Sequence, residues 1–211
     1  RMADFWGCAN GVGKVTNNLN PLGTGYTAQH DFGSGGLIGT DGGGNAPDSM
    51  VLRGAFGTGL AVQSPYGPQA NSNIKTTADN GLSQGDIIIV SDCTAADIIQ
   101  LTNADPDTSG TLVHNIGSGQ VPGNYNPASA TGTCSSGHCL SKVYGDDAQI
   151  FRARSITYSI GTNTTTGQPG LYRDNGDGLG AQELVDGVRN MQILYGEDTD
   201  DDGTANYYVA A

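Results

Sequence analysis

The sequence predicts an α+β fold, in which the end of a helix packs on an antiparallel β-sheet whose strands are joined by long glycine-rich loops. Residues 1–6 suit one helical turn, because Gly7 can adopt the left-handed conformation that ends many helices. Apolar and polar residues alternate in several short stretches of the second half, as in half-buried strands. The 34 glycines and 8 prolines make up about a fifth of the chain, below the level of about 25 to 30% that indicates disorder.

The predicted strands follow from runs of apolar and β-branched residues bounded by glycine and polar turns. Residues 86–90 contain the run Ile-Ile-Ile-Val of a centrally buried strand. For residues 94–101, periodicity does not decide between a strand and a short helix. Residues 163–170 are typical of a hairpin turn. The other predicted strands are residues 49–56, 148–154, 155–160 and 191–195, and the predicted loops are residues 10–48, 57–84 and 105–141.

Length and charge limit the classes of partner. The 211 residues are enough for one buried core, so we expect a single domain over residues 1–211. The net charge of −12 would repel a phosphate backbone, which argues against nucleic acid as a partner. Anionic bilayer surfaces are disfavoured for the same reason. The longest aliphatic run, residues 87–90, is far shorter than the roughly 20 residues that span a membrane.

Four cysteines allow three pairings, and their spacing favours one of them. Cys134 and Cys139 are a turn apart, which leaves Cys8 with Cys93. Disulfides imply a periplasmic or extracellular location. The alternative is a metal site formed by Cys134, His138 and Cys139, although no second Cys or His pair lies nearby at zinc-ligand spacing.

An acidic stretch near the C-terminus predicts a calcium loop. Asp198, Asp200 and Asp202 occupy positions 1, 3 and 5 of an EF-hand-type loop, with Gly203 at position 6. Thr204 offers a backbone carbonyl oxygen and Asn206 stands at position 9. Val209 replaces the bidentate glutamate of position 12, so the site would be weak or would borrow a ligand. An exposed acidic turn without an ion is the alternative.

Signatures of enzymes are missing from the sequence. It contains no Gly-x-Ser-x-Gly, His-Glu-x-x-His or phosphate-loop motif. The glycine pairs at residues 23–25 and 33–35 neither follow a strand nor open a helix, which argues against dinucleotide binding. Glycoside hydrolysis needs two carboxylates at a defined distance in space, and a sequence does not show that distance. We expect no catalytic residues and no enzymatic role.

Four regions together resemble the PilW-type minor pilins of bacterial type IV pili, which are related to the J-type pseudopilins of type II secretion. The C-terminal region has the order ELVDGV, NMQILYGEDTDDDG and YYV. Residues 1–8 resemble the end of the long pilin helix followed by the first cysteine of the family, and residues 85–93 resemble its central strand with the second. Residues 155–160 and 170–173 resemble a hairpin that both families share.

The resemblance implies a pilin-like domain whose N-terminal transmembrane helix is missing from this chain. It implies a strand at residues 98–101 and a minor pilin that takes part in assembly and priming of the pilus and in its tip complex. The implied partners are other minor pilins and tip proteins, at the periplasmic face of the inner membrane and in the extracellular pilus of a Gram-negative bacterium. The membrane would be reached only through the missing helix. A secreted, calcium-stabilised β-rich binding or adhesion module without a pilus role is the alternative.

Overall fold

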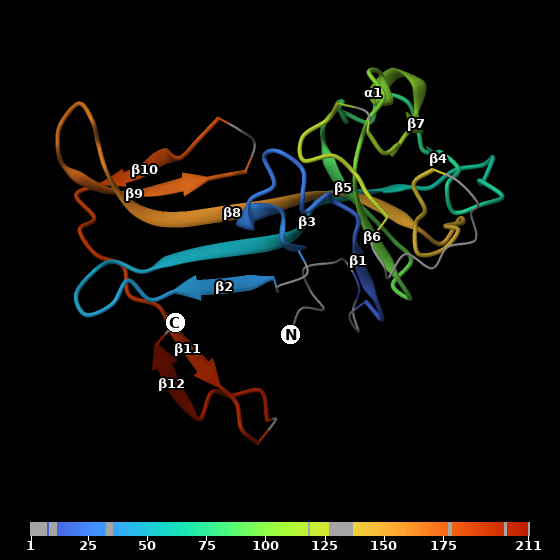
Figure 1. The fold of residues 1–211 in the computed structure, drawn as a ribbon. Helices are drawn as coiled ribbons and strands as arrows, with labels where there is room; N and C mark the ends of the chain where they lie inside the picture. The colour runs from blue at the N-terminus through green and yellow to red at the C-terminus, as the bar shows by residue number, and fades with distance from the viewer. Residues whose placement is uncertain are drawn as a thin grey trace. The chain divides into compact units, whose positions relative to one another are not determined.

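The computed structural model describes Cys8 and residues 12–32, 36–117, 119–126, 137–176, 179–200 and 202–210. These residues form an almost entirely β structure (Figure 1). Helical geometry among them is confined to the four-residue helix α1, Pro106–Ser109, and the 3-10 turn η2, Ala28–His30. The predicted α+β class is therefore wrong. The prediction depended on a helical turn at residues 1–6, which lie outside the described residues. The rest of the sequence has short apolar runs between glycine-rich turns, and such runs favour strands.

The chain forms two compact units, each built from separate stretches of sequence. The first unit comprises Arg1–Ser34 and Gly54–Arg154, and the second comprises Gly35–Arg53 and Ser155–Ala211. Two long strands, β3 (Ser49–Ala61) and β8 (Gln149–Thr162), contribute residues to both units. The division into two units does not test the number of domains, so the single domain expected over residues 1–211 stays a prediction.

A five-stranded arrangement forms the centre of the first unit. Its strands lie in the order β1 (Val15–Asn17), β6 (Ala96–Gln100), β5 (Ile87–Ser91), β8 and β3. β1 runs parallel to β6, whereas β5 is antiparallel to both β6 and β8. The strand predicted at residues 86–90 is confirmed as β5. Residues 98–100 belong to a strand, as the resemblance implied, and not to a short helix.

Both faces of these central strands are buried, which explains why their sequences are continuous apolar runs. Ile88 and Val90 of β5 pack in one hydrophobic cluster with Ile99 and Leu112. Ile89 points to the other face, where it packs in a second cluster with Leu19, Phe32 and Ile98. The alternation of the pleat thus distributes one run of apolar residues between two cores.

Short elements complete the first unit. β4 (Ile74–Lys75) pairs antiparallel with β7 (Thr111–Leu112). Helix α1 ends at Gly110, whose φ of 58° is left-handed, and a Cβ there would lie 2.5 Å from the Thr76 carbonyl oxygen. Glycine is therefore required at this close approach. β1, η2, β4, α1 and β7 all lie in stretches that were predicted to be loop.

The second unit consists of antiparallel strands. β2 (Leu37–Thr40) pairs with the first residues of β3. The last residues of β8 pair with β9 (Pro169–Asp174), which pairs with β10 (Gln182–Asp186). The predicted turn between β8 and β9 is present, and the Asn163 side chain accepts hydrogen bonds from the backbone of Thr165 and Thr166. The two strands predicted at residues 148–154 and 155–160 are one continuous strand.

The chain ends in a separate hairpin of β11 (Leu194–Glu197) and β12 (Tyr207–Ala210). The strand predicted at residues 191–195 thus begins later, at Leu194. The preceding residues are held by backbone contacts to another part of the second unit, as described below. Within the described residues, no helix has the length and apolar character needed to cross a bilayer.

Candidate functional site

The hairpin of β11 and β12 presents the acidic loop that the sequence singles out. Its register pairs Leu194 with Ala210 and Glu197 with Tyr207. Glycine is needed at Gly196, because a Cβ there would lie 2.7 Å from the Ala205 Cβ and 3.3 Å from the Tyr208 ring. The Tyr208 ring therefore covers the backbone of the opposite strand, and residues 198–200 and 202–206 lie in the loop at the end of the hairpin.

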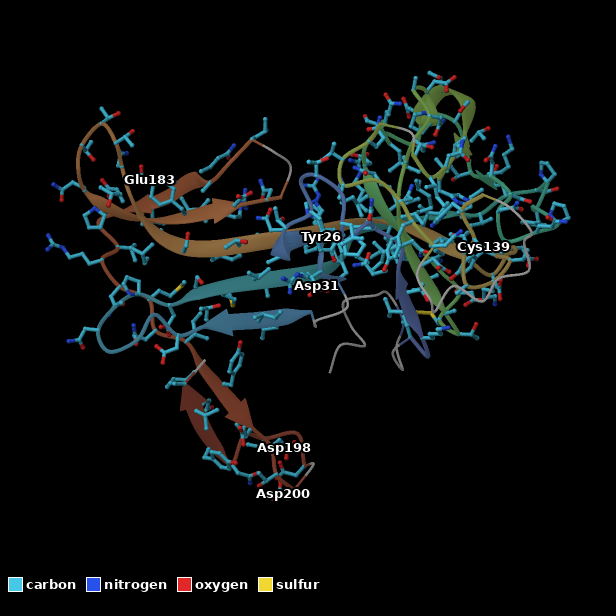
Figure 2. All side chains as sticks on the ribbon, viewed as in Figure 1. Tyr26, Asp31, Cys139, Glu183, Asp198 and Asp200 are labelled. Carbon is cyan, nitrogen blue, oxygen red and sulfur yellow. A yellow bond between two sulfur atoms is a disulfide. The ribbon has the colours of Figure 1, made fainter. Side chains whose placement is uncertain are left out.

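The three predicted aspartates converge at this loop. One carboxylate oxygen each from Asp198, Asp200 and Asp202 lies within 4.8 Å of the others, and all three side chains are exposed. Figure 2 shows Asp198 and Asp200 together at the tip of the hairpin. A hard cation such as Ca²⁺ binds groups of carboxylate oxygens of this kind. The positions expected from the aspartate spacing thus agree with the geometry, while calcium itself stays a prediction.

Hydrogen bonds within the loop shape the cluster. The Gly203 amide donates to Asp198 Oδ2 at 2.8 Å, and the Thr204 amide donates to Asp202 Oδ1 at 2.7 Å. Asn206 Oδ1 accepts from the Thr199 amide at 2.7 Å. Its amide nitrogen lies 3.4 Å from Asp200 Oδ2, so the Asn206 side chain connects Thr199 to one carboxylate of the cluster. Val209, at position 12, lies in β12 opposite Tyr195.

Asp48 attaches the hairpin to the β2–β3 turn, a contact that sequence reasoning missed. Its carboxylate accepts from the Ile193 amide at 2.6 Å and from the Gly42 amide at 3.0 Å, and its own amide donates to the Met191 carbonyl oxygen. These two amides, of Gly42 and Ile193, hold the pKa of Asp48 below its usual value. The Gly39 amide also donates to the Tyr195 hydroxyl oxygen. No local pattern could have linked positions that are about 145 residues apart in the sequence.

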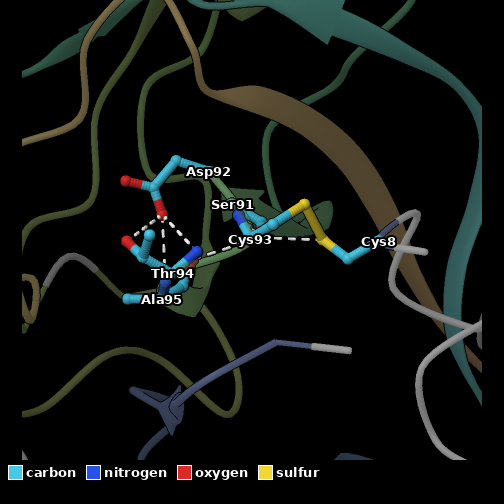
Figure 3. The surroundings of a disulfide bond; sticks show 6 residues. All are labelled: Cys8, Ser91, Asp92, Cys93, Thr94 and Ala95. Atoms are coloured by element: carbon cyan, nitrogen blue, oxygen red, sulfur yellow. Dashed lines mark hydrogen bonds between the residues drawn. A yellow bond between two sulfur atoms is a disulfide. The ribbon is translucent and has the colours of Figure 1, made fainter. Parts of the chain in front are cut away.

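The cysteines confirm one predicted pairing. Cys8 and Cys93 form a disulfide with a Cα–Cα distance of 5.6 Å (Figure 3). Beside it, Asp92 Oδ1 accepts from the Thr94 amide and hydroxyl and from the Ala95 amide, which fixes the turn between β5 and β6. Cys139 is also disulfide-bonded. Its predicted partner, Cys134, lies outside the described residues. Because Cys139 is oxidised, it offers no thiolate for the alternative metal site.

His138, the other member of that alternative site, belongs to a buried pair of histidines. Its Nδ1 lies 2.7 Å from His114 Nδ1. The Ser72 carbonyl oxygen, 3.1 Å from His114 Nε2, can only accept, so Nε2 carries the hydrogen of His114. His114 Nδ1 then accepts from His138 Nδ1. Burial lowers the pKa of both rings, and the neighbouring His114 lowers that of His138 further, to about 3.

A buried carboxylate organises the same unit. Asp97 is 0% exposed. It accepts hydrogen bonds from the Asn18 side chain at 2.8 Å, from the Ser141 amide and hydroxyl, and from the Tyr144 hydroxyl at 2.7 Å. Burial and the Asp97 charge raise the pKa of Tyr144 well above its usual value, so the tyrosine stays a donor. These contacts join β6 to residues 141–144, and their role is structural.

Comparisons with known proteins point to the C-terminal part of the chain. No curated protein and no solved structure shows a significant match. Residues 157–211 match the family model for PilW, described as type IV pilus-assembly protein W. The matched segment contains β9, β10 and the hairpin with the acidic loop. This part of the chain is therefore similar to a type IV pilus-assembly protein.

Proposed function

We propose that this chain is the globular part of a minor pilin that takes part in assembly and priming of a bacterial type IV pilus and in its tip complex. The family match over residues 157–211 is the observation that carries the proposal. The Cys8–Cys93 disulfide supports an oxidising location, such as the periplasm and the extracellular pilus. The protein would act by docking to other minor pilins and tip proteins, and not as an enzyme.

Gene deletion tests the proposal. A deletion strain should lose most of its surface pili and its twitching motility, and the full-length gene should restore both. A gene without the codons for an N-terminal apolar helix should fail to restore them, because that segment would anchor the protein in the membrane. Immunoblots must show that both complementing proteins accumulate. Normal piliation and twitching in the deletion strain would refute the minor-pilin role.

A second candidate is a secreted, calcium-stabilised β-rich binding or adhesion module without a pilus role. The three converging carboxylates favour it, because weak calcium sites of this kind are common in extracellular modules. The codons upstream of this segment discriminate between the two functions. A prepilin leader followed by an apolar helix supports the minor pilin, whereas a cleavable secretory signal peptide supports the secreted module.

A further inference from the structure

The terminal hairpin has backbone edges that the rest of the described chain leaves without a partner strand. β11 pairs with β12 in a sheet of two strands. A two-stranded hairpin is at best marginally stable by itself in water. Its outer edges carry backbone amides and carbonyls that can accept a further strand. The contacts of Asp48 and Tyr195 hold the hairpin at one end, and no other described strand pairs with either edge.

One face of this hairpin is apolar and exposed. The register places Leu194, Gly196, Tyr208 and Ala210 on the same face. We call these four residues the open face. Leu194 is 62% exposed and Tyr208 is 67% exposed. On the opposite face, Tyr195 and Val209 are partly buried and Tyr207 is 47% exposed. Large apolar side chains grouped on an exposed face are typical of interaction surfaces.

The charge beside the open face indicates what kind of partner can bind. Residues 197–202 include five carboxylates, and no Lys or Arg follows Arg189. An acidic segment would be repelled by this loop, whereas Lys or Arg side chains would be attracted to it. A second copy of the chain is a poor occupant, because each copy carries a net charge of −12.

We propose that the hairpin of β11 and β12 is a docking site for an extended segment of another protein that combines apolar residues with Lys or Arg. The segment adds a strand at an edge of the hairpin, so that backbone hydrogen bonds contribute affinity. Its apolar side chains cover Leu194 and Tyr208, and its basic side chains lie beside Asp198, Asp200 and Asp202. The inference deepens the proposed function, because it assigns a chemistry to the partner of a docking protein.

Site-specific photo-crosslinking in the native bacterium tests the proposal. A photoreactive amino acid replaces Tyr208 in the full-length protein, with Leu22 as the control position, because Leu22 is 93% exposed and lies in the first unit. We expect a crosslinked product about fivefold more abundant at position 208 than at position 22. Mass spectrometry should locate the crosslink in a partner segment that contains both apolar residues and Lys or Arg. A crosslinker at Leu194 should capture the same segment.

Charge variants make the test specific. The triple substitution Asp198→Asn, Asp200→Asn and Asp202→Asn should lower the yield at position 208 at least about threefold, because the attraction to basic side chains is lost. The matched control is Asp79→Asn, Asp146→Asn and Asp147→Asn, which removes three exposed carboxylates from the first unit and should leave the yield unchanged. Immunoblots establish that all variants accumulate.

Three outcomes would overturn the docking proposal. The first is an equal crosslinking yield at positions 208 and 22. The second is a crosslink to a second copy of this chain. The third is a captured segment without basic residues, with the same crosslinking yield in the charge variants as in the unsubstituted protein. Failure of the proposed function is distinguishable from each of them. Normal pili in the deletion strain, together with the predicted crosslink in the strain that carries the photoreactive protein, would refute the pilus role and retain the docking site.

Discussion

At the scale of single residues, the buried carboxylate of Asp97 accepts hydrogen bonds from three other residues of the first unit. Asp97→Asn replaces one carboxylate oxygen with an amide that must face donors from Asn18, Ser141 or Tyr144. We expect the free energy of unfolding to fall by about 2 to 4 kcal/mol. Urea denaturation measures this change. Asp146→Asn, on an exposed residue nearby, is the control and should change stability by less than about 0.5 kcal/mol. Equal midpoints for the two variants would contradict this role of Asp97.

The buried histidine pair predicts a dependence of stability on pH. The pKa values of His114 and His138 in the folded protein lie below the value of 6.5 expected after unfolding. Below pH 6.5 the unfolded chain therefore binds protons that the folded chain does not, so stability falls as the pH falls. The slope approaches about 1.4 kcal/mol per pH unit for each histidine.

The range from pH 6.5 to 5 isolates this effect. Asp92 has a pKa lowered to about 2, because Lys142 and the Ala95 and Thr94 donors outweigh the effect of burial. Its stabilising contribution is complete at pH 5 and is lost only at lower pH. His138→Gln should reduce the slope of unfolding free energy against pH between 6.5 and 5. Since the pKa of His30 is also lowered, His30→Gln serves as the comparison. An unchanged slope in His138→Gln would show that this ring gains protons normally in the folded state.

At the scale of elements, the Cys8–Cys93 disulfide ties the N-terminal residue Cys8 to the turn between β5 and β6. It spans a sequence separation of 85. In the chain-entropy model, a loop of this length stabilises the fold by about 4 to 5 kcal/mol. The double variant Cys8→Ala and Cys93→Ala should lose most of that amount in urea denaturation. A loss below about 1 kcal/mol would indicate that the unfolded chain is not restricted by this bridge.

The acidic loop predicts a response to calcium. If the ion binds the folded state at millimolar affinity, a calcium concentration ten times the Kd should raise Tm by about 3 to 6 °C. A thermal scan in calcium and in chelator measures the difference. The substitutions Asp198→Asn, Asp200→Asn and Asp202→Asn should abolish it, while magnesium at equal concentration should have little effect. Identical melting midpoints in calcium and in chelator would show that the loop is an acidic turn that binds no calcium.

At the scale of the whole molecule, excess negative charge opposes compaction. The net charge is −12, with 21 acidic and 9 basic residues. Raising the sodium chloride concentration to physiological ionic strength shortens the Debye length to about 8 Å, which screens this repulsion. We therefore expect Tm in chelator to rise with salt. Potassium chloride should give the same shift if screening is the cause. A Tm that stays constant or falls would show that like-charge repulsion is not limiting.

The sequence predicted those strands whose burial is visible locally. β5 was recognisable from its run of β-branched residues, and the hairpin turn after β8 from its Asn, Thr and Gly residues. β1 was missed because it lies in a glycine- and asparagine-rich span and pairs with β6 about 80 residues later. β8 was divided into two strands at a polar stretch, although its two halves continue as one strand with different neighbours. The bounds of these strands depend on pairing with strands that are far away in the sequence. No local sequence pattern indicates such pairing.

The candidate site could be predicted only where its residues lie close together in the sequence. The aspartate spacing identified the three converging carboxylates, because these residues share one loop. The anchoring by Asp48 and the orientation of Asn206 depend on the folded register of the hairpin. The α+β class was wrong because it gave weight to residues 1–6, whereas the described residues are nearly all in strands and loops.

The exposed hairpin has a consequence for solubility. A pair of strands with Leu194 and Tyr208 exposed on its surface can pair edge to edge with another copy and aggregate. The carboxylates at its tip act as gatekeepers, because two hairpins cannot stack without bringing like charges together. This protection needs ionised side chains, and the isoelectric point of the chain is about 4.2. The repulsion between whole chains vanishes at that pH, so we expect association through the edge of the hairpin to be strongest there.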